Sequence, residues 1–319
     1  MALVPGIPGI TKAAEPLATW LQTRDQNPFA LASGLPLAPS IPSARRWQFD
    51  TTFNAANTEL AQFRGDSSML FDAETHETRI SAAYAFNDRW SLRASLGQLS
   101  IGDGFMDGPI ERFHRAFGFD NGDRGQLDTA APVIEVRGSG APLYSLDHAT
   151  SGTAPLLVDL TRRWRFGNAD VSGISLGTKF ATGSVSRLTD SGSTDVSLSA
   201  FTLLGVGERL AFGARAGILL RTGNDLLEDH ARGQVPFAGI LLRYRLGENW
   251  SALLQSDAHG ALYRRLPDFL GSTSNQLNFG LSRRIGGSSE FQVTLAEDLP
   301  ALHSTDVALT LNWHLTPGH

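Results

Sequence analysis

The sequence contains no cysteine among its 319 residues. This excludes a disulfide framework, a cysteine-ligated zinc site and a cysteine nucleophile. An excess of basic residues is also absent: the formal net charge is −5 and the isoelectric point is near 5.9. The chain therefore lacks the overall positive charge of nucleic-acid-binding proteins, and no nucleic-acid partner is expected. No run approaches the roughly 18 apolar residues of a membrane-spanning helix, which excludes that kind of anchor.

A recognisable signal peptide is missing as well. Residues 1–20 have no basic region and are interrupted by Pro5, Gly6 and Pro8. Either the protein is cytoplasmic or its leader is absent from this chain. The choice between these readings rests on the remaining sequence.

What the sequence does contain is alternation of apolar and polar residues, the period of a strand with two different faces. Residues 47–54 alternate cleanly, and Val307, Leu309 and Leu311 share one face near the end of the chain. A composition of 41% hydrophobic residues is too apolar for disorder. The alternation predicts an all-β protein with about twelve strands, at 46–56, 75–86, 89–100, 154–165, 169–181, 194–204, 208–221, 235–246, 249–258, 274–284, 289–297 and 305–315.

The connections between these strands alternate in length. Five are tight and rich in Asn, Asp or Gly, which supply hairpin turns: 86–88, 166–168, 205–207, 246–249 and 285–288. The others are longer, from residues 298–304 to the loop at 101–153. This pattern predicts a transmembrane antiparallel up-and-down β-barrel over residues 45–319, with short periplasmic turns and long extracellular loops. Residues 1–44 are then a periplasmic segment, and the protein is placed in a bacterial outer membrane.

Tryptophan positions favour the same fold. Outer-membrane barrels carry belts of aromatic residues at the membrane interface. Five tryptophans lie near strand ends at the predicted periplasmic rim: Trp90, Trp164 and Trp250 beside short turns, Trp47 at the start of the first strand and Trp313 near the end of the last. The alternative is a soluble all-β domain in which these positions arise by chance.

Charged residues occupy the polar faces of the strands. A midplane Arg or Lys facing lipid costs roughly 2–4 kcal/mol, so these side chains are expected to line a lumen. The predicted lumen residues are Asp50, Glu77, Arg79, Arg93, Asp159, Arg163, Lys179, Asp195, Arg215, Arg221, Arg243, Asp257 and Asp306. Their mixed sign is compatible with a hydrated narrow pore or with a network of ion pairs that fills it.

The segment before the first strand combines apolar residues with prolines. Phe29 and Leu35 stand among Pro28, Pro36 and Pro39, which disfavour both helix and strand. An apolar side chain left in water loses roughly 1.5–3 kcal/mol of burial free energy. Phe29 and Leu35 are therefore predicted to lie against the periplasmic mouth or the lumen wall, so that the segment plugs or constricts the barrel.

The loop at 101–153 is long enough to suggest a function. A short amphipathic helix is predicted there from the spacing of Ile110, Phe113, His114 and Phe117, with Asp107 as N-cap. It would fold over or into the pore mouth, or simply pack on the barrel rim. Glu111 lies one turn from His114, but no second histidine completes a metal motif, and no metal or cofactor is expected.

Twelve-stranded outer-membrane phospholipases raise a third possibility, a lipid hydrolase. Asp147, His148 and Ser151 supply an acid, a base and a nucleophile. A separation of three in an extended strand, however, directs His148 and Ser151 to opposite faces. A Gly-x-Ser-x-Gly motif is also absent from the sequence. An enzyme is therefore not the favoured interpretation.

Two motifs carry a resemblance to a known family. Residues 24–30, Arg-Asp-Gln-Asn-Pro-Phe-Ala, precede Ser-Gly-Leu-Pro at 33–36, and Phe-Met-Asp-Gly-Pro-Ile at 105–110 precedes 113–118 and 122–124. The chain resembles an uncharacterised family of bacterial outer-membrane β-barrel proteins, a domain of unknown function. The resemblance implies architecture and location but no chemistry. It runs from about residue 24 to the C-terminus.

Three functional hypotheses follow. The first is a passive channel for a small solute, and the second is a closed barrel that acts structurally or through its surface loops. The third is the lipid hydrolase. Outer-membrane lipid, lipopolysaccharide and a small solute are the expected partners, while the solute and the oligomeric state stay open.

Overall fold

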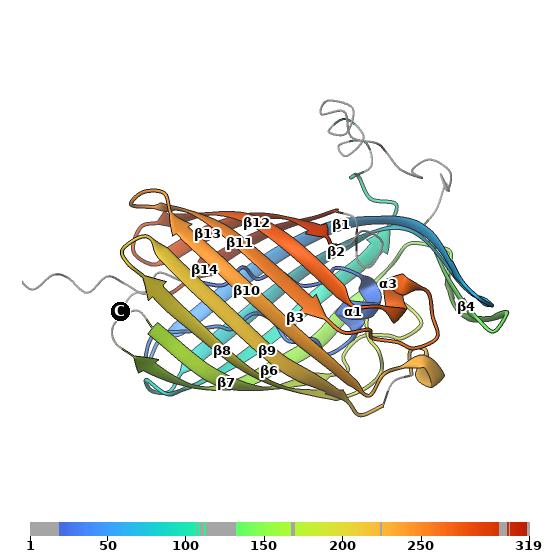
Figure 1. Cartoon of the computed structure of the whole chain (residues 1–319), viewed down its shortest axis with the longest axis horizontal. Coiled ribbons are helices and arrows are strands. Elements are labelled where there is room, and N and C mark those ends of the chain that lie inside the picture. Colours follow the sequence, from blue (N-terminus) through green and yellow to red (C-terminus); the bar gives the residue numbers. More distant parts are fainter. Residues whose placement is uncertain are drawn as a thin grey trace, which may run out of the picture.

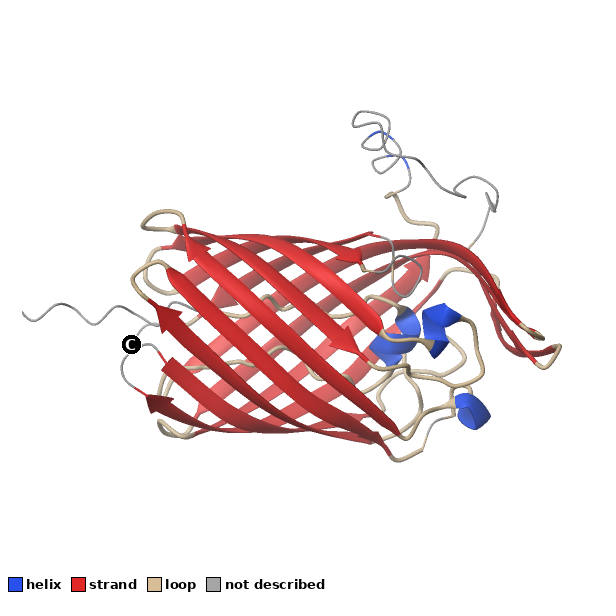
Figure 2. Cartoon of the chain, viewed as in Figure 1, coloured by secondary structure: helices blue, strands red, loops and turns tan. Residues whose placement is uncertain are grey.

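The computed structural model describes residues 19–106, 108, 112, 132–166, 170–223, 225–299, 305 and 307–317. Within them, twelve strands form a closed antiparallel barrel (Figures 1 and 2). The barrel strands are β1 (Trp47–Arg64), β2 (Ser67–Ala85), β3 (Trp90–Gly102), β6 (Thr150–Phe166), β7 (Asp170–Phe180), β8 (Asp195–Val206), β9 (Leu210–Arg221), β10 (Gln234–Arg245), β11 (Trp250–His259), β12 (Ser274–Ile285), β13 (Ser289–Asp298) and β14 (Val307–Leu315). Each pairs with its neighbour in the chain, and β1 closes the barrel on β14 from Phe49↔Leu315 to Asn57↔Val307. The predicted all-β barrel of twelve strands is confirmed.

The two ends of the barrel differ. Short turns join the strands at the end where β1 begins, which we call the short-turn end (left in Figure 1). The opposite, long-loop end carries the helices α1 (Pro28–Ala32), α3 (Asp268–Gly271) and η1 (Glu228–His230). No helix among the described residues is long and apolar enough to cross a membrane.

Two pairs of strands extend the fold beyond the prediction. The predicted connection at 57–74 is strand instead: β1 and β2 pair continuously to Arg64↔Ser67 around a tight turn that contains Gly65, with φ +59°. The alternation of residues persists through this hairpin, and only the turn interrupts it. The predicted loop at 101–153 contains β4 (Val133–Gly138) and β5 (Ala141–Leu146), and β4 pairs with residues 68–72 of β2.

The wall presents apolar residues outward and polar residues inward. Leu96, Ile240 and Leu295 are about half exposed on the outer face. The five predicted belt tryptophans are 38–55% exposed, as expected for side chains that face outside the barrel. Among the predicted lumen residues, Asp306 lies outside the described residues. Each of the others has at most about a tenth of its side chain exposed.

The inside of the barrel is occupied by residues 19–43, which we call the luminal segment. In Figure 1 it is the blue chain within the barrel, with α1 at the long-loop end. At the short-turn end, Arg243 and Gln292 donate hydrogen bonds to Thr19 Oγ1. The chain then runs to α1 at the long-loop end and back to the short-turn end. There the Arg45 amide donates a hydrogen bond to the Ala85 carbonyl, just before β1 starts. The segment thus traverses the lumen twice.

An apolar cluster closes the long-loop end above α1. Phe29 packs edge-on against Tyr144 and Tyr263, with ring centroids 5.8 and 6.1 Å apart. Burial raises the pKa of Tyr144 to about 12. Other large members come from β2, β4, β9, β10 and the long loops and include Met69, Phe71, Ile134, Leu188, Leu219, Leu226, Phe237, Leu262, Leu266, Phe269 and Leu270.

Candidate functional site

The occupied lumen is the candidate functional site, and its centre is a polar contact across the barrel. Arg24 Nη2 lies 2.6 Å from Glu77 Oε1 on β2. The next residue, Asp25, has its Oδ2 2.9 Å from His259 Nε2 on β11 and accepts from Ser274. Strands β2 and β11 are five places apart in a twelve-strand ring, so they lie on nearly opposite walls. We call the Arg24–Asp25 contacts the cross-brace.

The residues after the cross-brace build α1. Asn27 is its N-cap, and the side-chain oxygen accepts from the Phe29 amide at 3.0 Å. Pro28 occupies the first helical turn, where the missing N–H costs nothing. Ser33 ends the helix and donates its hydroxyl to the Phe29 carbonyl. The motif that carried the family resemblance therefore encodes a helix that places Phe29 in the apolar cluster.

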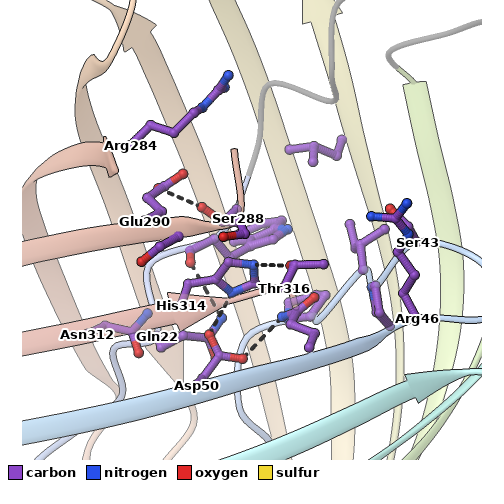
Figure 3. A pocket seen from close by; sticks show the side chains of 18 of the residues that line it. Gln22, Ser43, Arg46, Asp50, Arg284, Ser288, Glu290, Asn312, His314 and Thr316 are labelled. Atoms are coloured by element: carbon purple, nitrogen blue, oxygen red, sulfur yellow. Dashed lines mark hydrogen bonds and ion pairs between the residues drawn. The ribbon is translucent and has the colours of Figure 1, made fainter. Parts of the chain in front are cut away.

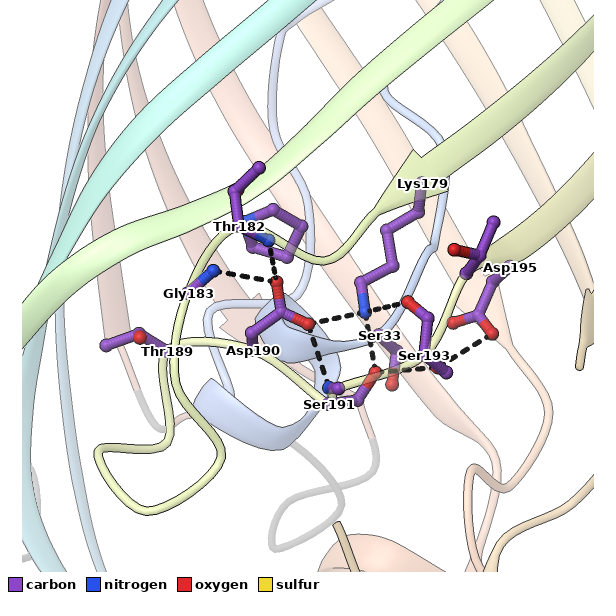
Figure 4. Close-up of polar contacts among 12 residues, drawn as sticks. Ser33, Lys179, Thr182, Gly183, Thr189, Asp190, Ser191, Ser193 and Asp195 are labelled. Atoms are coloured by element: carbon purple, nitrogen blue, oxygen red, sulfur yellow. Dashed lines mark hydrogen bonds and ion pairs between the residues drawn. The ribbon is translucent and has the colours of Figure 1, made fainter. Parts of the chain in front are cut away.

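Gly34 permits a close approach between the luminal segment and the wall. A Cβ at this position would lie 2.8 Å from Asp195 Cβ and 3.0 Å from Lys179 Cβ. Figure 4 shows Lys179 reaching into the loop between β7 and β8. Its ammonium donates to Asp190 Oδ1 at 2.7 Å, to the Ser191 hydroxyl at 2.7 Å and to the Ser193 carbonyl at 2.8 Å. This buried ion pair fixes the loop over the returning chain.

Apolar contacts hold the segment nearer the short-turn end. Trp20 and Leu21 are fully buried and form a cluster with wall residues Leu203, Leu241 and Leu253. Two wall glycines make room for them. A Cβ on Gly213 would lie 2.8 Å from Trp20, and one on Gly280 would lie 2.9 Å from Leu21.

Most of the charged wall residues are paired with each other or with the luminal segment. Glu77 also accepts from Arg79, and Arg93 is 2.9 Å from Asp159. Arg215 lies 2.7 Å from Asp257. Arg243 lies 3.2 Å from Glu290, and Asp50 lies 2.9 Å from His314 Nδ1. Most of these charges therefore form a network of ion pairs around the luminal segment.

A vestibule of about 450 Å³ opens at the short-turn end (Figure 3). One side is polar, and there His314 lies between Asp50 and Thr316. The lining also includes the apolar residues Trp20 and Ile41 of the luminal segment. Two cavities deeper in the lumen have only about 10 Å³ each, room for roughly one water. The vestibule therefore narrows abruptly where the luminal segment fills the barrel.

The predicted plug residues lie within this arrangement. Phe29 is fully buried and Leu35 is 7% exposed. Both belong to the cluster at the long-loop end rather than to the periplasmic mouth. The predicted loop helix cannot be compared, because Asp107, Ile110, Phe113, His114 and Phe117 lie outside the described residues.

The residues weighed for hydrolysis lie on the surface. His148 Nδ1 is 2.9 Å from Asp147 Oδ1, and the two side chains are 70% and 85% exposed. Hydrogen bonding by His148 lowers the pKa of Asp147. Ser151 is the second residue of β6 and is exposed. Among the described residues, no group of three His, Asp or Glu side chains is placed to hold a metal ion.

Several site residues were not identified from the sequence. His259, His314 and Glu290 face the lumen, and Asp190 sits in a loop. The alternation of β11, β13 and β14 could have assigned the first three to the inner face. Asp190 carried no such signal, because only the folded loop brings it to Lys179.

Comparisons with solved structures support the fold. An outer membrane channel from Pseudomonas putida F1 matches with a TM-score of 0.60 and 13% identity, over 87% of this chain and 97% of that chain. The transport unit of the autotransporter AIDA-I from Escherichia coli matches with a TM-score of 0.50 and 9% identity, over 93% and 100%. The P. putida toluene transporter TodX gives 0.44 and 10%, over 92% and 94%. At these identities the first two matches establish the fold alone, that of transmembrane outer-membrane β-barrels.

Sequence comparison assigns the family. A search of curated proteins finds no match to this chain. The profile described as "Protein of unknown function (DUF3187)" matches residues 11–315, nearly the whole chain. With a barrel fold shared with outer-membrane channels, the predicted resemblance to an uncharacterised outer-membrane family is confirmed. The chain belongs to the DUF3187 family of proteins of unknown function.

Proposed function

We propose that the protein is an outer-membrane channel for a small solute and that the luminal segment is its plug, present here in the closed position. One observation carries the proposal: the lumen is filled by a separate chain segment rather than by the wall. In outer-membrane barrels the short turns are periplasmic, so the vestibule would face the periplasm and the apolar cluster the exterior. Lipid would surround the apolar outer face.

The way in which the segment is held supports a movable plug. The hydrogen bonds described between this segment and the strands each involve a side chain. Gln255 bonds both the amide and the carbonyl of Leu21, and Arg93 donates to the Ala38 carbonyl. Such contacts break one at a time, whereas a β-ladder would make the segment part of the wall. Displacement of the segment would leave the polar inner face hydrated.

A second candidate is a permanently closed barrel, in which the luminal segment is structural and the loops carry the function. The ion pairs Arg93–Asp159 and Arg215–Asp257 favour it, because they join wall strands to one another: the first links the neighbours β3 and β6, and the second reaches from β9 across β10 to β11. The two candidate functions differ in whether the luminal segment ever moves out of the lumen.

Permeability of the full-length protein separates them. In Arg24→Ala/Asp25→Ala the cross-brace is removed, with the loss of charge-assisted hydrogen bonds of about 1.5–3 kcal/mol each. We expect ion conductance in planar bilayers and swelling rates of proteoliposomes to rise at least about tenfold over wild type. The matched control is Glu208→Ala/Arg209→Ala, an adjacent acid and base exposed in a short turn. A folded cross-brace variant as impermeable as wild type would reject the channel in favour of the closed barrel.

A further inference from the structure

The inner face of the β9–β10 ribbon carries a regular pattern of arginines and apolar residues. Strands β9 and β10 pair with Arg243 opposite Ala211 and Gly239 opposite Arg215. Buried side chains therefore follow each other from the short-turn end to the long-loop end in the order Arg243, Leu241, Arg215, Phe237, Leu219 and Arg221. We call Arg243, Arg215 and Arg221 the arginine ladder. At about 3.3 Å per residue, its rungs lie roughly 13 and 20 Å apart along the strand.

Glycines opposite the large side chains let them lie flat across the ribbon. A Cβ on Gly239 would lie 3.0 Å from Arg215 Nε, and one on Gly217 would lie 2.5 Å from the Phe237 ring. The ribbon therefore presents guanidinium groups and apolar side chains alternately to whatever occupies the lumen beside it.

Each arginine of the ladder has at least one guanidinium N–H group that donates no hydrogen bond within the protein. The Nε atoms of Arg215, Arg221 and Arg243 are buried without an acceptor, and so is Arg221 Nη2. All three residues are at least nine-tenths buried. Arg221 donates to the Leu262 carbonyl and lies over the Tyr263 ring. Buried guanidinium N–H groups without acceptors are costly, and an oxyanion is their best acceptor.

The luminal segment occupies the ladder in the manner of an amphipathic ligand. The Thr19 hydroxyl oxygen accepts from Arg243 at 3.1 Å. The Trp20 ring lies against Gly213 and 5.9 Å from the Arg215 guanidinium. An oxygen on one rung and an aromatic ring beside the next is the arrangement that a small molecule with an acidic head and an apolar body would reproduce.

We propose that the arginine ladder binds small amphipathic monoanions and forms their path through the lumen once the luminal segment moves. The inference rests on the proposed channel function and adds its substrate class. The acidic head would pass between guanidinium groups, while the apolar body would contact Leu241, Phe237 and Leu219. The opposite wall, at β1 and β2, offers mainly hydroxyl, amide and paired charged groups between Gln48 and Asn57, and its large buried apolar residues, Leu60, Met69 and Phe71, lie beyond that stretch.

The test uses full-length protein carrying Arg24→Ala/Asp25→Ala, with benzenesulfonate as probe because it keeps its charge at every working pH. Reversal potentials under a gradient of potassium benzenesulfonate give its permeability relative to K⁺. We expect the anion to be favoured over K⁺, and over methanesulfonate, which lacks the apolar body. Added Arg215→Gln should reduce the benzenesulfonate preference about tenfold or more, and Arg215→Lys should restore part of it. Arg283→Gln, on the exposed outer face, is the matched control.

Binding provides a second readout that does not depend on flux. Equilibrium dialysis of benzenesulfonate against the same variants in nanodiscs should show saturable binding that Arg215→Gln weakens about tenfold. Conductance without a preference for the anion would overturn the proposed role of the arginine ladder and leave the proposed channel function standing. Saturable, arginine-dependent binding without any conductance would overturn the channel and keep the ladder as a binding site. Absence of both preference and binding in folded protein would overturn the proposed substrate class.

Discussion

Replacement of Trp20 by alanine should release the luminal segment while leaving the barrel intact. Trp20 is fully buried, packs among leucines of the inner wall and lies over Arg215. Its ring belongs to the segment and contributes nothing to the strand ladders. The substitution therefore acts on the equilibrium between docked and undocked segment rather than on barrel closure.

The size of the effect follows from the buried area. A tryptophan buries about 150–250 Å², which at about 25 cal/mol per Å² corresponds to roughly 4–6 kcal/mol. Measured costs of truncating buried Phe or Trp to Ala are about 3–5 kcal/mol. With a value of about 4 kcal/mol, the undocked fraction should rise on the order of a thousandfold, since each 1.4 kcal/mol is a factor of ten.

Thiol labelling can measure this shift because the chain has no cysteine of its own. Ser40→Cys places a reporter in the returning half of the luminal segment, where Ser40 is 8% exposed and its hydroxyl has no hydrogen-bond partner. The labelling rate of Cys-substituted protein by a small maleimide then reports the undocked fraction. Trp250→Ala is the control, because Trp250 also pairs with an arginine, Arg283, but stands 46% exposed outside the barrel.

Two results would refute the reasoning. An increase in labelling of less than about tenfold in Trp20→Ala would mean that the apolar contact does not hold the segment in place. An equal increase in Trp250→Ala would mean that labelling follows general loosening of the barrel. Circular dichroism and heat-modifiable gel mobility would establish in each case that the barrel is folded.

Three further substitutions test other contacts of the site. Gly34→Ala should raise labelling in the same assay about tenfold, because its Cβ would lie 2.8 Å from Asp195 Cβ and overpacking costs about 1–3 kcal/mol; unchanged labelling would show that the wall yields there. Asn27→Ala removes the N-cap of α1 at a cost of about 1 kcal/mol and should raise labelling roughly fivefold, whereas Asn27→Asp should preserve the docked state. Lys179→Met leaves Asp190 buried without its cation, at about 3–5 kcal/mol, so the loop between β7 and β8 should become protease-sensitive; Lys179→Met/Asp190→Leu should recover resistance if the charge imbalance is the cause.

The barrel was predictable because alternation is a local property. Each strand is recognisable from apolar residues two positions apart, such as Trp90, Leu92, Ala94 and Leu96 on β3. The ends of β1 and β2 were missed for a local reason as well. Gly65 and Asp66 form a turn so short that it gives no clear break between the two strands in the sequence.

The route of the luminal segment could not be predicted in the same way. The prolines and apolar residues at 27–39 predicted contact with the barrel, but they do not indicate which residues of the wall the segment contacts. Asp25 meets His259 across 234 positions of sequence, and Thr19 meets Gln292 across 273. Which inward charge pairs with which depends on register and barrel closure, and a single sequence shows neither.

The double traverse of the lumen has a topological consequence. The segment enters near Thr19 and leaves near Arg45 at the same mouth of the barrel, so its two arms form a bent chain open only toward the short-turn end. A single traverse would require a chain end to be pulled lengthwise through the pore. The bent segment can instead enter or leave through the short-turn end with its two arms side by side, so that no chain terminus has to pass through the pore. β1 and β14 can therefore pair first and close the barrel. The luminal segment can then enter or leave the lumen without breaking the β1–β14 pairing.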